Sequence, residues 1–276
     1  MAGPHHARVL LRGLLFLMQL YFKELGQADG TPGTPLIMLH GLFGSSDNWL
    51  NVAPRLGGKC YALDLRNHGH SPHSEEMDYA LMAGDVAEFL DAQKLDVVNV
   101  LGHSMGGKVA MQFALTHPGR VRKLVIVDMA VRAYSPEHRP IFEALLALDL
   151  KPLHSRREIE DALAPGIPDL TLRRFLLKNL AHESEDARAF KWRIPLPAIF
   201  ANYPKLCAPI APQAPFFGSA LFLHGGLSPY VSEADVPRIR ELFPQAVIET
   251  IPQARHWVHA DAPDDFVRHV SEFLKR

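Results

Sequence analysis

Short uninterrupted apolar runs alternate with longer amphipathic segments between residues 36 and 128. Alternation of fully apolar strands with helices that carry one apolar face predicts a mostly parallel sheet with helices on both sides. The expected strands are 36–39, 60–63, 97–101 and 123–127, and the expected helices are 80–93 and 106–116. This pattern predicts an α/β protein of doubly wound topology.

The alternation breaks between residues 129 and 215. This stretch is rich in proline and contains no apolar run that is typical of a strand. Its expected helices are 141–148, 156–163 and 170–180, and strands are expected again at 220–224 and 247–251, before a last amphipathic helix. We therefore expect a core formed by residues 18–128 and 216–276, with residues 129–215 inserted as a helical cap, or lid.

Residues 1–17 precede the first expected element of the core. The apolar stretch 8–18 is interrupted by Arg12 and is too short to cross a bilayer. No small-residue cleavage site follows it, and residues 19–24 have the pattern of a first strand. We interpret residues 1–17 as an N-terminal extension with Met18 as the natural start; an interfacial anchor or a targeting signal is the alternative.

Composition narrows the choice of partners. With 276 residues and 47% hydrophobic content, the chain suits one large domain with a buried core. Its 29 basic and 30 acidic side chains give a formal net charge of −1, which favours neither nucleic acid nor an anionic membrane. Cys60 and Cys207 lie far apart, which indicates a reducing, cytoplasmic setting. We expect a small-molecule substrate and no stable membrane insertion, while the oligomeric state stays open.

The strongest chemical signal is the segment Gly102-His-Ser104-Met-Gly106, which joins an expected strand to an expected helix. A Gly-x-Ser-x-Gly turn in this context holds the serine hydroxyl exposed, because side chains at the two glycine positions would clash. Ser104 is therefore predicted to be a nucleophile. The Met105 backbone N–H, at the helix N-terminus, and the Leu42 backbone N–H, in the glycine-rich loop after strand 36–39, are predicted to form an oxyanion hole.

A serine hydroxyl needs a base, and His256 is the best candidate among 15 histidines. It follows the last expected strand, in the chain order Ser, Asp, His that such folds use. The acid is harder to assign because the loop after strand 220–224 has Ser228 where a carboxylate is expected. Asp128, at the end of strand 123–127, is the predicted acid, and Asp235 is its main rival.

Further residues near these motifs are candidates for substrate contact or for structure. Phe43, His103 and Trp257 are predicted to contact substrate, although His103 is also suited to packing within the turn. We interpret residues 64–71 as a hydrogen-bonded structural turn, because its histidines lack a carboxylate partner at metal-ligand spacing. We predict no metal and no cofactor. Six apolar side chains of the cap are candidates for a pocket lining or for the cap core: Phe142, Leu145, Leu146, Phe175, Leu176 and Phe200.

From about residue 19 onward the chain resembles the YbfF-like esterases of the α/β-hydrolase superfamily and their eukaryotic abhydrolase-domain relatives. The segments that carry the resemblance are 40–48, 64–71, 102–108, 225–231 and 256–260. The resemblance implies hydrolysis of carboxylic esters and acyl thioesters, no cofactor, and an acid after the nucleophile helix, which matches Asp128. It departs at Arg255, where relatives have glycine, so the shape and charge of the pocket rim differ here.

These observations predict a serine esterase that hydrolyses short to medium acyl esters through Ser104, His256 and Asp128. A cofactor-free perhydrolase or a carbon–carbon bond hydrolase is the alternative on the same three residues. A hydrolase-fold protein that binds a ligand without catalysis is the alternative from a different class.

Overall fold

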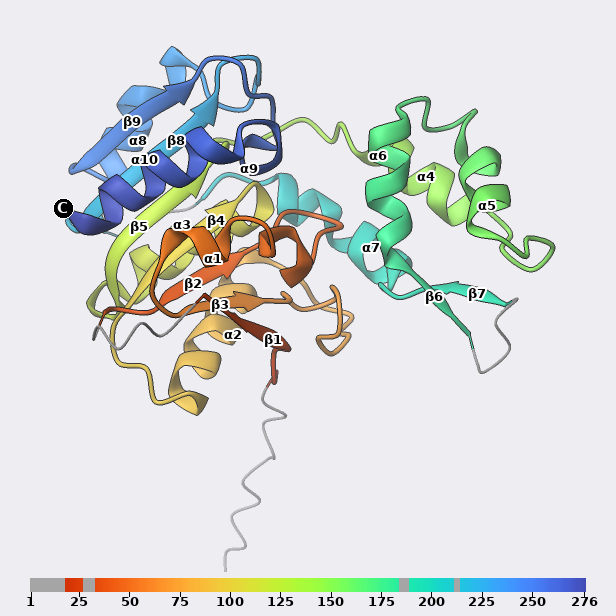
Figure 1. Cartoon of the computed structure of the whole chain (residues 1–276), viewed down its shortest axis with the longest axis horizontal. Coiled ribbons are helices and arrows are strands. Elements are labelled where there is room, and N and C mark those ends of the chain that lie inside the picture. The colour runs from red at the N-terminus through yellow and green to blue at the C-terminus, as the bar shows by residue number, and fades with distance from the viewer. Residues whose placement is uncertain (1–17, 27–32, 184–188, 211–213) are drawn as a thin grey trace, which may run out of the picture.

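A computed structural model describes residues 18–26, 33–183, 189–210 and 214–276. The expected extension 1–17 lies outside the described residues. Seven strands form one twisted sheet in the order β1-β3-β2-β4-β5-β8-β9, with β1 antiparallel to β3 and every other pair parallel (Figure 1). The strands are β1 (Phe22–Leu25), β2 (Leu36–Leu39), β3 (Cys60–Leu63), β4 (Val98–His103), β5 (Val121–Val127), β8 (Ser219–Gly225) and β9 (Ala246–Ile251).

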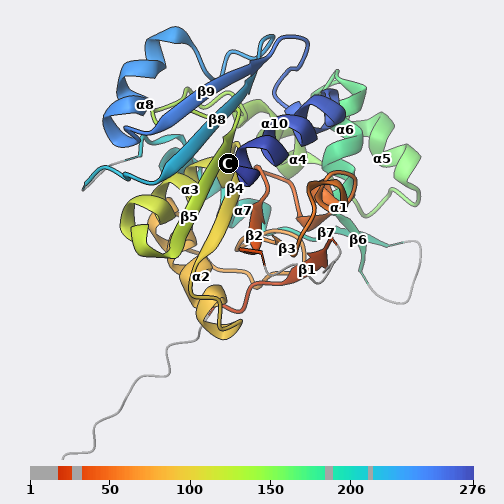
Figure 2. The ribbon, with the colours of Figure 1, turned by 60° about the vertical axis from the view of Figure 1, so that its left-hand side comes forward.

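Helices cover both faces of this sheet (Figure 2). One face carries α2 (Tyr79–Ala92), α3 (Met105–Thr116) and α8 (Val236–Leu242), and the other carries α1 (Ala53–Leu56), α9 (Val258–Asp261) and α10 (Pro263–Lys275). Along β2, Ile37 and Leu39 pack with the first group while Leu36 and Met38 pack with the second. Burial on both faces explains why the strands are uninterrupted apolar runs and confirms the predicted fold class.

Residues between β5 and β8 form a separate lobe, drawn in green and teal beside the sheet in Figure 1. We call residues 129–215 the inserted lobe. Its helices are α4 (Arg139–Ala147), α5 (Arg156–Leu163), α6 (Leu170–Leu176) and α7 (Leu196–Cys207). In the described parts of the chain, no helix has both the length and the apolar character that a membrane span needs.

The inserted lobe departs from the sequence prediction in helix α7, which was not predicted, and in the segment that follows α6. The expected helix 170–180 ends at Leu176, and a short antiparallel pair, β6 (Leu180–His182) with β7 (Phe190–Trp192), follows it. The helix ends early because the Asn179 side chain donates to the Leu176 carbonyl at 3.3 Å and to the Phe43 carbonyl at 2.8 Å. The expectation that the lobe lacks strands was therefore wrong.

A buried lysine ties the two ends of the inserted lobe to the core. Lys108 on α3 donates through Nζ to the Arg132 carbonyl at 2.9 Å and to the Ala208 carbonyl. Beside it the Tyr134 N–H donates to the Cys207 carbonyl at 2.9 Å, so the two connecting segments run as a pair. The lobe is thereby anchored one helical turn from the start of α3, next to the carboxyl ends of β4 and β5.

Candidate active site

Ser104 lies on a sharp turn between β4 and α3 with a backbone φ of 53° and ψ of −119°. Non-glycine residues avoid this region, so the conformation costs about 1–3 kcal/mol and persists only where its surroundings impose it. A Cβ atom at Gly102 would lie 2.1 Å from the Gly106 carbonyl oxygen, and one at Gly106 would lie 2.4 Å from the Leu39 oxygen. The two glycines are thus what lets strand, turn and helix approach closely enough to present the hydroxyl.

The structure brings Ser104, His256 and Asp128 into one hydrogen-bonded chain. The Ser104 Oγ lies 3.0 Å from His256 Nε2, and His256 Nδ1 lies 2.6 Å from Asp128 Oδ2. The side chain of Asp128 is fully buried at the end of β5, whereas His256 comes from the loop after β9. Because the carboxylate accepts the Nδ1 proton, Nε2 is left free to accept the proton of the serine hydroxyl.

Two donors besides the imidazole hold the Asp128 carboxylate. The Gly225 N–H donates to Oδ1 at 3.0 Å, and the Ser228 hydroxyl donates to Oδ2. The rival acid, Asp235, instead pairs with Arg132 at 3.0 Å and accepts from Ser232. Among the described contacts none joins Asp235 to the imidazole, so the geometry places only Asp128 at His256 Nδ1.

Aromatic rings fix the position of the imidazole. The Tyr230 ring stacks on His256 with centroids 3.9 Å apart and an interplanar angle of 19°. His103 Nε2 donates to the His256 carbonyl at 2.9 Å, and burial lowers the pKa of His103 well below its usual value. His103, a predicted substrate contact, lines the pocket beside Ser104, but its Nε2 proton is donated to the His256 carbonyl and is not free for substrate.

The loop after β2 leaves the Leu42 backbone amide available beside Ser104. The next four amides all donate within the protein: Phe43 to His68 Nε2, Gly44 to the Gly41 carbonyl, Ser45 to Asn48 and Ser46 to Asp64. The Leu42 N–H has no acceptor among the described residues, and Leu42 lines a pocket together with Ser104 and Met105. Met105 begins α3, so its N–H has no acceptor within the helix.

The turn 64–71 is hydrogen-bonded to the loop after β2. The Asp64 carboxylate accepts from the Ser46 N–H at 2.6 Å and from the His70 N–H at 2.8 Å. Burial lowers the pKa of His68 to about 3, so this ring is neutral and its Nε2 accepts from the Phe43 N–H at 3.2 Å. These bonds confirm the prediction of a structural turn.

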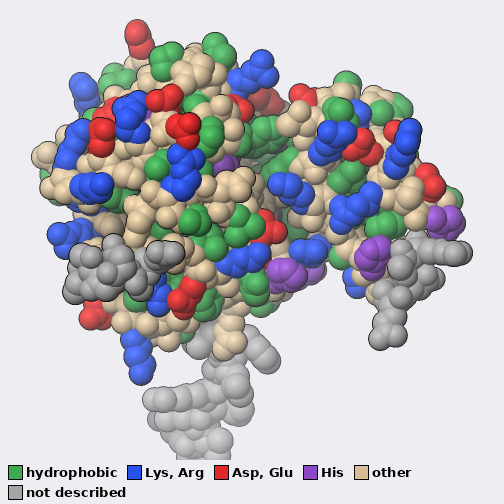
Figure 3. Space-filling model, in the orientation of Figure 1, with side chains coloured by type: hydrophobic (Ala, Val, Ile, Leu, Met, Phe, Trp, Pro, Cys, Tyr) green, Lys and Arg blue, Asp and Glu red, His purple; other side chains and the backbone are tan. Residues whose placement is uncertain are grey.

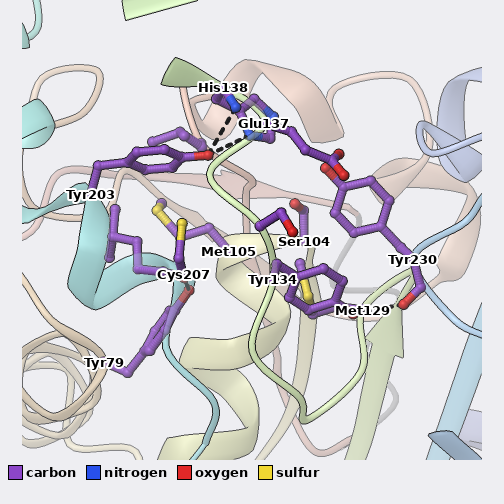
Figure 4. Close-up of a pocket in the computed structure, with 13 residues that line it drawn as sticks. Tyr79, Ser104, Met105, Met129, Tyr134, Glu137, His138, Tyr203, Cys207 and Tyr230 are labelled. Carbon is purple, nitrogen blue, oxygen red and sulfur yellow. Dashed lines mark hydrogen bonds between the residues drawn. The ribbon is translucent and has the colours of Figure 1, made fainter. Parts of the chain in front are cut away.

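Two pockets open on Ser104 from different sides. The first, which we call the tyrosine pocket, is lined by Tyr79, Tyr134, Tyr203 and Tyr230 together with Met105, Met129 and Cys207 (Figure 4). The second, which we call the imidazole-side pocket, is lined by His256, Trp257, Phe43, Leu172 and Phe175. Phe43 and Trp257 thus lie where a substrate contact is possible, whereas the tyrosines were not predicted.

This fold, with a serine on the turn after β4 and a histidine facing it, defines a class of hydrolases. The chain belongs to the α/β-hydrolase fold family, whose family model matches residues 34–263. It is similar to Esterase YbfF of Escherichia coli (strain K12), with 35% identity over 261 residues that cover 93% of this chain and 99% of that protein. It is also similar to the sn-1-specific diacylglycerol lipase ABHD11 of Xenopus tropicalis, with 40% identity over 258 residues that cover 90% of this chain and 80% of that protein.

Solved structures agree with these relatives. A marine microorganism esterase superposes with a TM-score of 0.88 at 40% identity, and the match covers 93% of this chain and 99% of that one. The resemblance to YbfF-like esterases is thereby confirmed.

Proposed function

We propose that this protein hydrolyses carboxylic esters with Ser104 as nucleophile, His256 as general base and Asp128 as the acid that orients the imidazole. The observation that carries the proposal is the unbroken path from the Ser104 hydroxyl through His256 to a buried carboxylate, at 3.0 Å and 2.6 Å. Similarity to relatives named esterase or lipase supports a carboxylic ester hydrolase.

In the acylation step Ser104 Oγ attacks the ester carbonyl carbon while His256 Nε2 takes the hydroxyl proton. The carbonyl oxygen becomes an oxyanion, which the Leu42 and Met105 amides stabilise. The bond to the alcohol oxygen then breaks, and that oxygen leaves with the proton from His256. In the deacylation step water attacks the acyl-serine, His256 accepts a proton from the water, and Ser104 regains its own.

The tyrosine pocket suits an apolar acyl group of short to medium length. Its cavity volume is only about 50 Å³. Three of its four tyrosine hydroxyls are hydrogen-bonded within the protein: Tyr79 donates to the Leu206 carbonyl at 2.5 Å, Tyr134 donates to the Tyr230 carbonyl at 2.6 Å, and Tyr203 bonds to His138 (Figure 4). These three tyrosines therefore contribute mainly the faces of their rings to the pocket. The inserted lobe supplies Tyr203 and Cys207 and acts as the lid over this pocket.

A series of p-nitrophenyl esters from acetyl to palmitoyl, with acylglycerols and acyl-CoA thioesters alongside, tests the proposal. Ser104→Ala should lower turnover by about 10⁶, the loss typical of removing the nucleophile from such a unit. Ser135→Ala is a matched control, because Ser135 lines the tyrosine pocket while the side-chain hydrogen bonds of His256 among the described residues go to Asp128 and Ser104. Full ester hydrolysis by the Ser104→Ala protein would refute the proposal.

A further inference from the structure

A third pocket lies next to the imidazole-side pocket. It is lined by Asn48, Thr171, Arg174, Phe175, Lys178, Trp257, His259 and Ala260, and we call it the outer pocket. Its cavity volume is about 270 Å³, far larger than the roughly 50 Å³ of the imidazole-side pocket. The two pockets share Asn48, Phe175 and Trp257, so they lie side by side.

The leaving group, rather than the acyl group, is directed this way. During acylation the departing atom takes its proton from His256 Nε2, so the alcohol or thiol must lie on the imidazole side of Ser104. His256 lines the imidazole-side pocket and is absent from the lining of the tyrosine pocket. The alcohol or thiol portion of the substrate is therefore directed into the imidazole-side pocket, which adjoins the outer pocket.

The outer pocket carries positive charge. Lys178 and Arg174 both line it, and no carboxylate is among the described residues lining it or the imidazole-side pocket. Arg174 shares one N–H with Glu160 at 3.3 Å, whereas Lys178 has no ion-pair partner among the described residues. Figure 3 shows Lys and Arg side chains over α6, at the edge of the hollow between the core and the inserted lobe.

His259 is a buried and neutral residue in the lining of the outer pocket. Its side chain lines the outer pocket and is only 6% exposed, yet its Nδ1 is buried without a hydrogen-bond partner in the described structure. A buried polar atom of this kind costs about 1–3 kcal/mol unless something pairs with it. Burial lowers the pKa of His259 to about 4, so the ring is neutral and has one N–H to donate.

A hydrogen bond next to Lys178 fixes the position of the cationic side of the outer pocket. The residue after Lys178, Asn179, is buried and donates to the Phe43 carbonyl at 2.8 Å, which fixes this turn against the loop beside Ser104. The ring centroids of Phe175 and Trp257 lie 5.3 Å apart, and both rings line both pockets. The outer pocket therefore combines apolar rings with two cationic side chains.

We propose that the outer pocket is a leaving-group subsite that binds an oxyanion, phosphate or carboxylate, on the alcohol or thiol portion of the substrate through Lys178 and Arg174. The inference rests on the proposed ester hydrolysis. The chemistry at the ester bond is unchanged: the acyl carbon forms its bond to Ser104 as the bond to the leaving oxygen or sulfur breaks. The anionic group stays on the released alcohol or thiol.

Matched ester pairs with one acyl group test this subsite. One pair is 1-butyrylglycerol and 1-butyrylglycerol 3-phosphate, and the other is propyl butyrate and 3-butyryloxypropanoate. The unaltered protein should favour at least one anionic ester of a pair by about tenfold or more in kcat/KM, the effect of one charge-assisted hydrogen bond. Preference within the first pair alone identifies a phosphate site, and preference within the second alone identifies a carboxylate site.

Variants then assign the effect to residues. Lys178→Met should raise KM for the favoured anionic ester about tenfold and leave the neutral ester unchanged, while Lys178→Arg should keep the preference. Arg157→Gln is the control. The Arg157 side chain on α5 is 91% exposed, so this substitution removes one positive charge outside the pocket.

Equal kcat/KM for neutral and anionic esters in both pairs would overturn the subsite and leave the proposed function intact. An equal loss in Arg157→Gln would also overturn it, since the effect would then come from net charge. Absence of turnover for all four esters and for p-nitrophenyl butyrate would remove the proposed function itself, and the subsite with it.

Discussion

Moving the acid from position 128 to position 228 tests how the carboxylate acts. Asp128→Asn should lower kcat by about 10⁴, or about 5 kcal/mol of transition-state stabilisation, as expected for an acid that sets the imidazole tautomer. The reason is local. The Asp128 carboxylate accepts from Gly225, Ser228 and His256 Nδ1, and an amide at this position has one oxygen to accept with and an NH₂ group that donates. His256 Nε2 would then carry the proton and could no longer accept one from Ser104.

Ser228 offers a second attachment point for the same carboxylate. Its hydroxyl donates to Asp128 Oδ2, the oxygen that also faces His256 Nδ1. A carboxylate at position 228 therefore approaches the imidazole from a neighbouring strand end. The double variant Asp128→Ala with Ser228→Asp should recover about 10- to 100-fold in kcat over Asp128→Ala alone, a recovery of about 1.4–3 kcal/mol.

The assay is steady-state hydrolysis of p-nitrophenyl butyrate, with thermal unfolding of each variant measured in parallel. The control adds the same charge at the opposite end of β8, Asp128→Ala with Ser219→Asp, and should show no recovery. Asp128→Asn with undiminished kcat would refute the role of the acid. Equal recovery from positions 219 and 228 would refute the geometric reasoning.

Two further predictions concern stability. Burial lowers the pKa of Lys108 from 10.5 to about 8, so between these values the unfolded chain binds a proton that the folded chain does not. The contribution of Lys108 to the free energy of unfolding should therefore rise with pH across that window, by at most about 3 kcal/mol. In urea unfolding, the Lys108→Met variant should show a flatter dependence of this free energy on pH than the unaltered protein. The same pH dependence in both proteins would contradict this. Gly102→Ala should destabilise the fold by at least about 2 kcal/mol, because its Cβ would meet a backbone oxygen at 2.1 Å, whereas Gly84→Ala, with open space around it, should be neutral or stabilising in the same unfolding experiment.

The core was predictable because its signals are local and repeated. Each parallel strand is buried on both faces, so it reads as an unbroken apolar run, and strand 60–63 has the predicted bounds in the structure. The turn at Ser104 was predictable for a related reason. Any side chain at Gly102 or Gly106 would clash with backbone atoms of the adjacent strands and helix, so both positions require glycine. His256 followed from chain order once the strands were known.

The inserted lobe was less predictable because distant contacts shape it. The sequence prediction missed helix α7 because proline usually interrupts a helix, and Pro195 precedes this helix while Pro197 and Pro204 lie within it. Pro197 is tolerated because it lies in the first turn, where no amide donor is needed. Helix α6 ends where Asn179 bonds to Phe43, a residue 136 positions earlier. No periodicity in the lobe indicates such a contact.

Asp128 and the pockets beside Ser104 also depend on contacts between distant parts of the chain. Asp128 was a candidate from its place at a strand end and from the family resemblance, because the sequence does not reveal that Ser228 donates to that carboxylate. The tyrosine pocket draws Tyr79 from α2, Tyr203 from α7 and Tyr230 from the loop after β8. Side chains so far apart in the chain meet only when the inserted lobe packs on the core.

Covalent labelling of the nucleophile, in which the serine oxygen attacks phosphorus and displaces fluoride, is the most direct test of the central claim. The protein is reacted with a fluorophosphonate ester, digested, and the modified peptide is located by mass spectrometry. We predict one adduct, on Ser104, which is lost in Ser104→Ala and slowed in a folded His256→Ala variant. Modification of another residue, or an unmodified Ser104 in a protein that hydrolyses esters, would contradict the account.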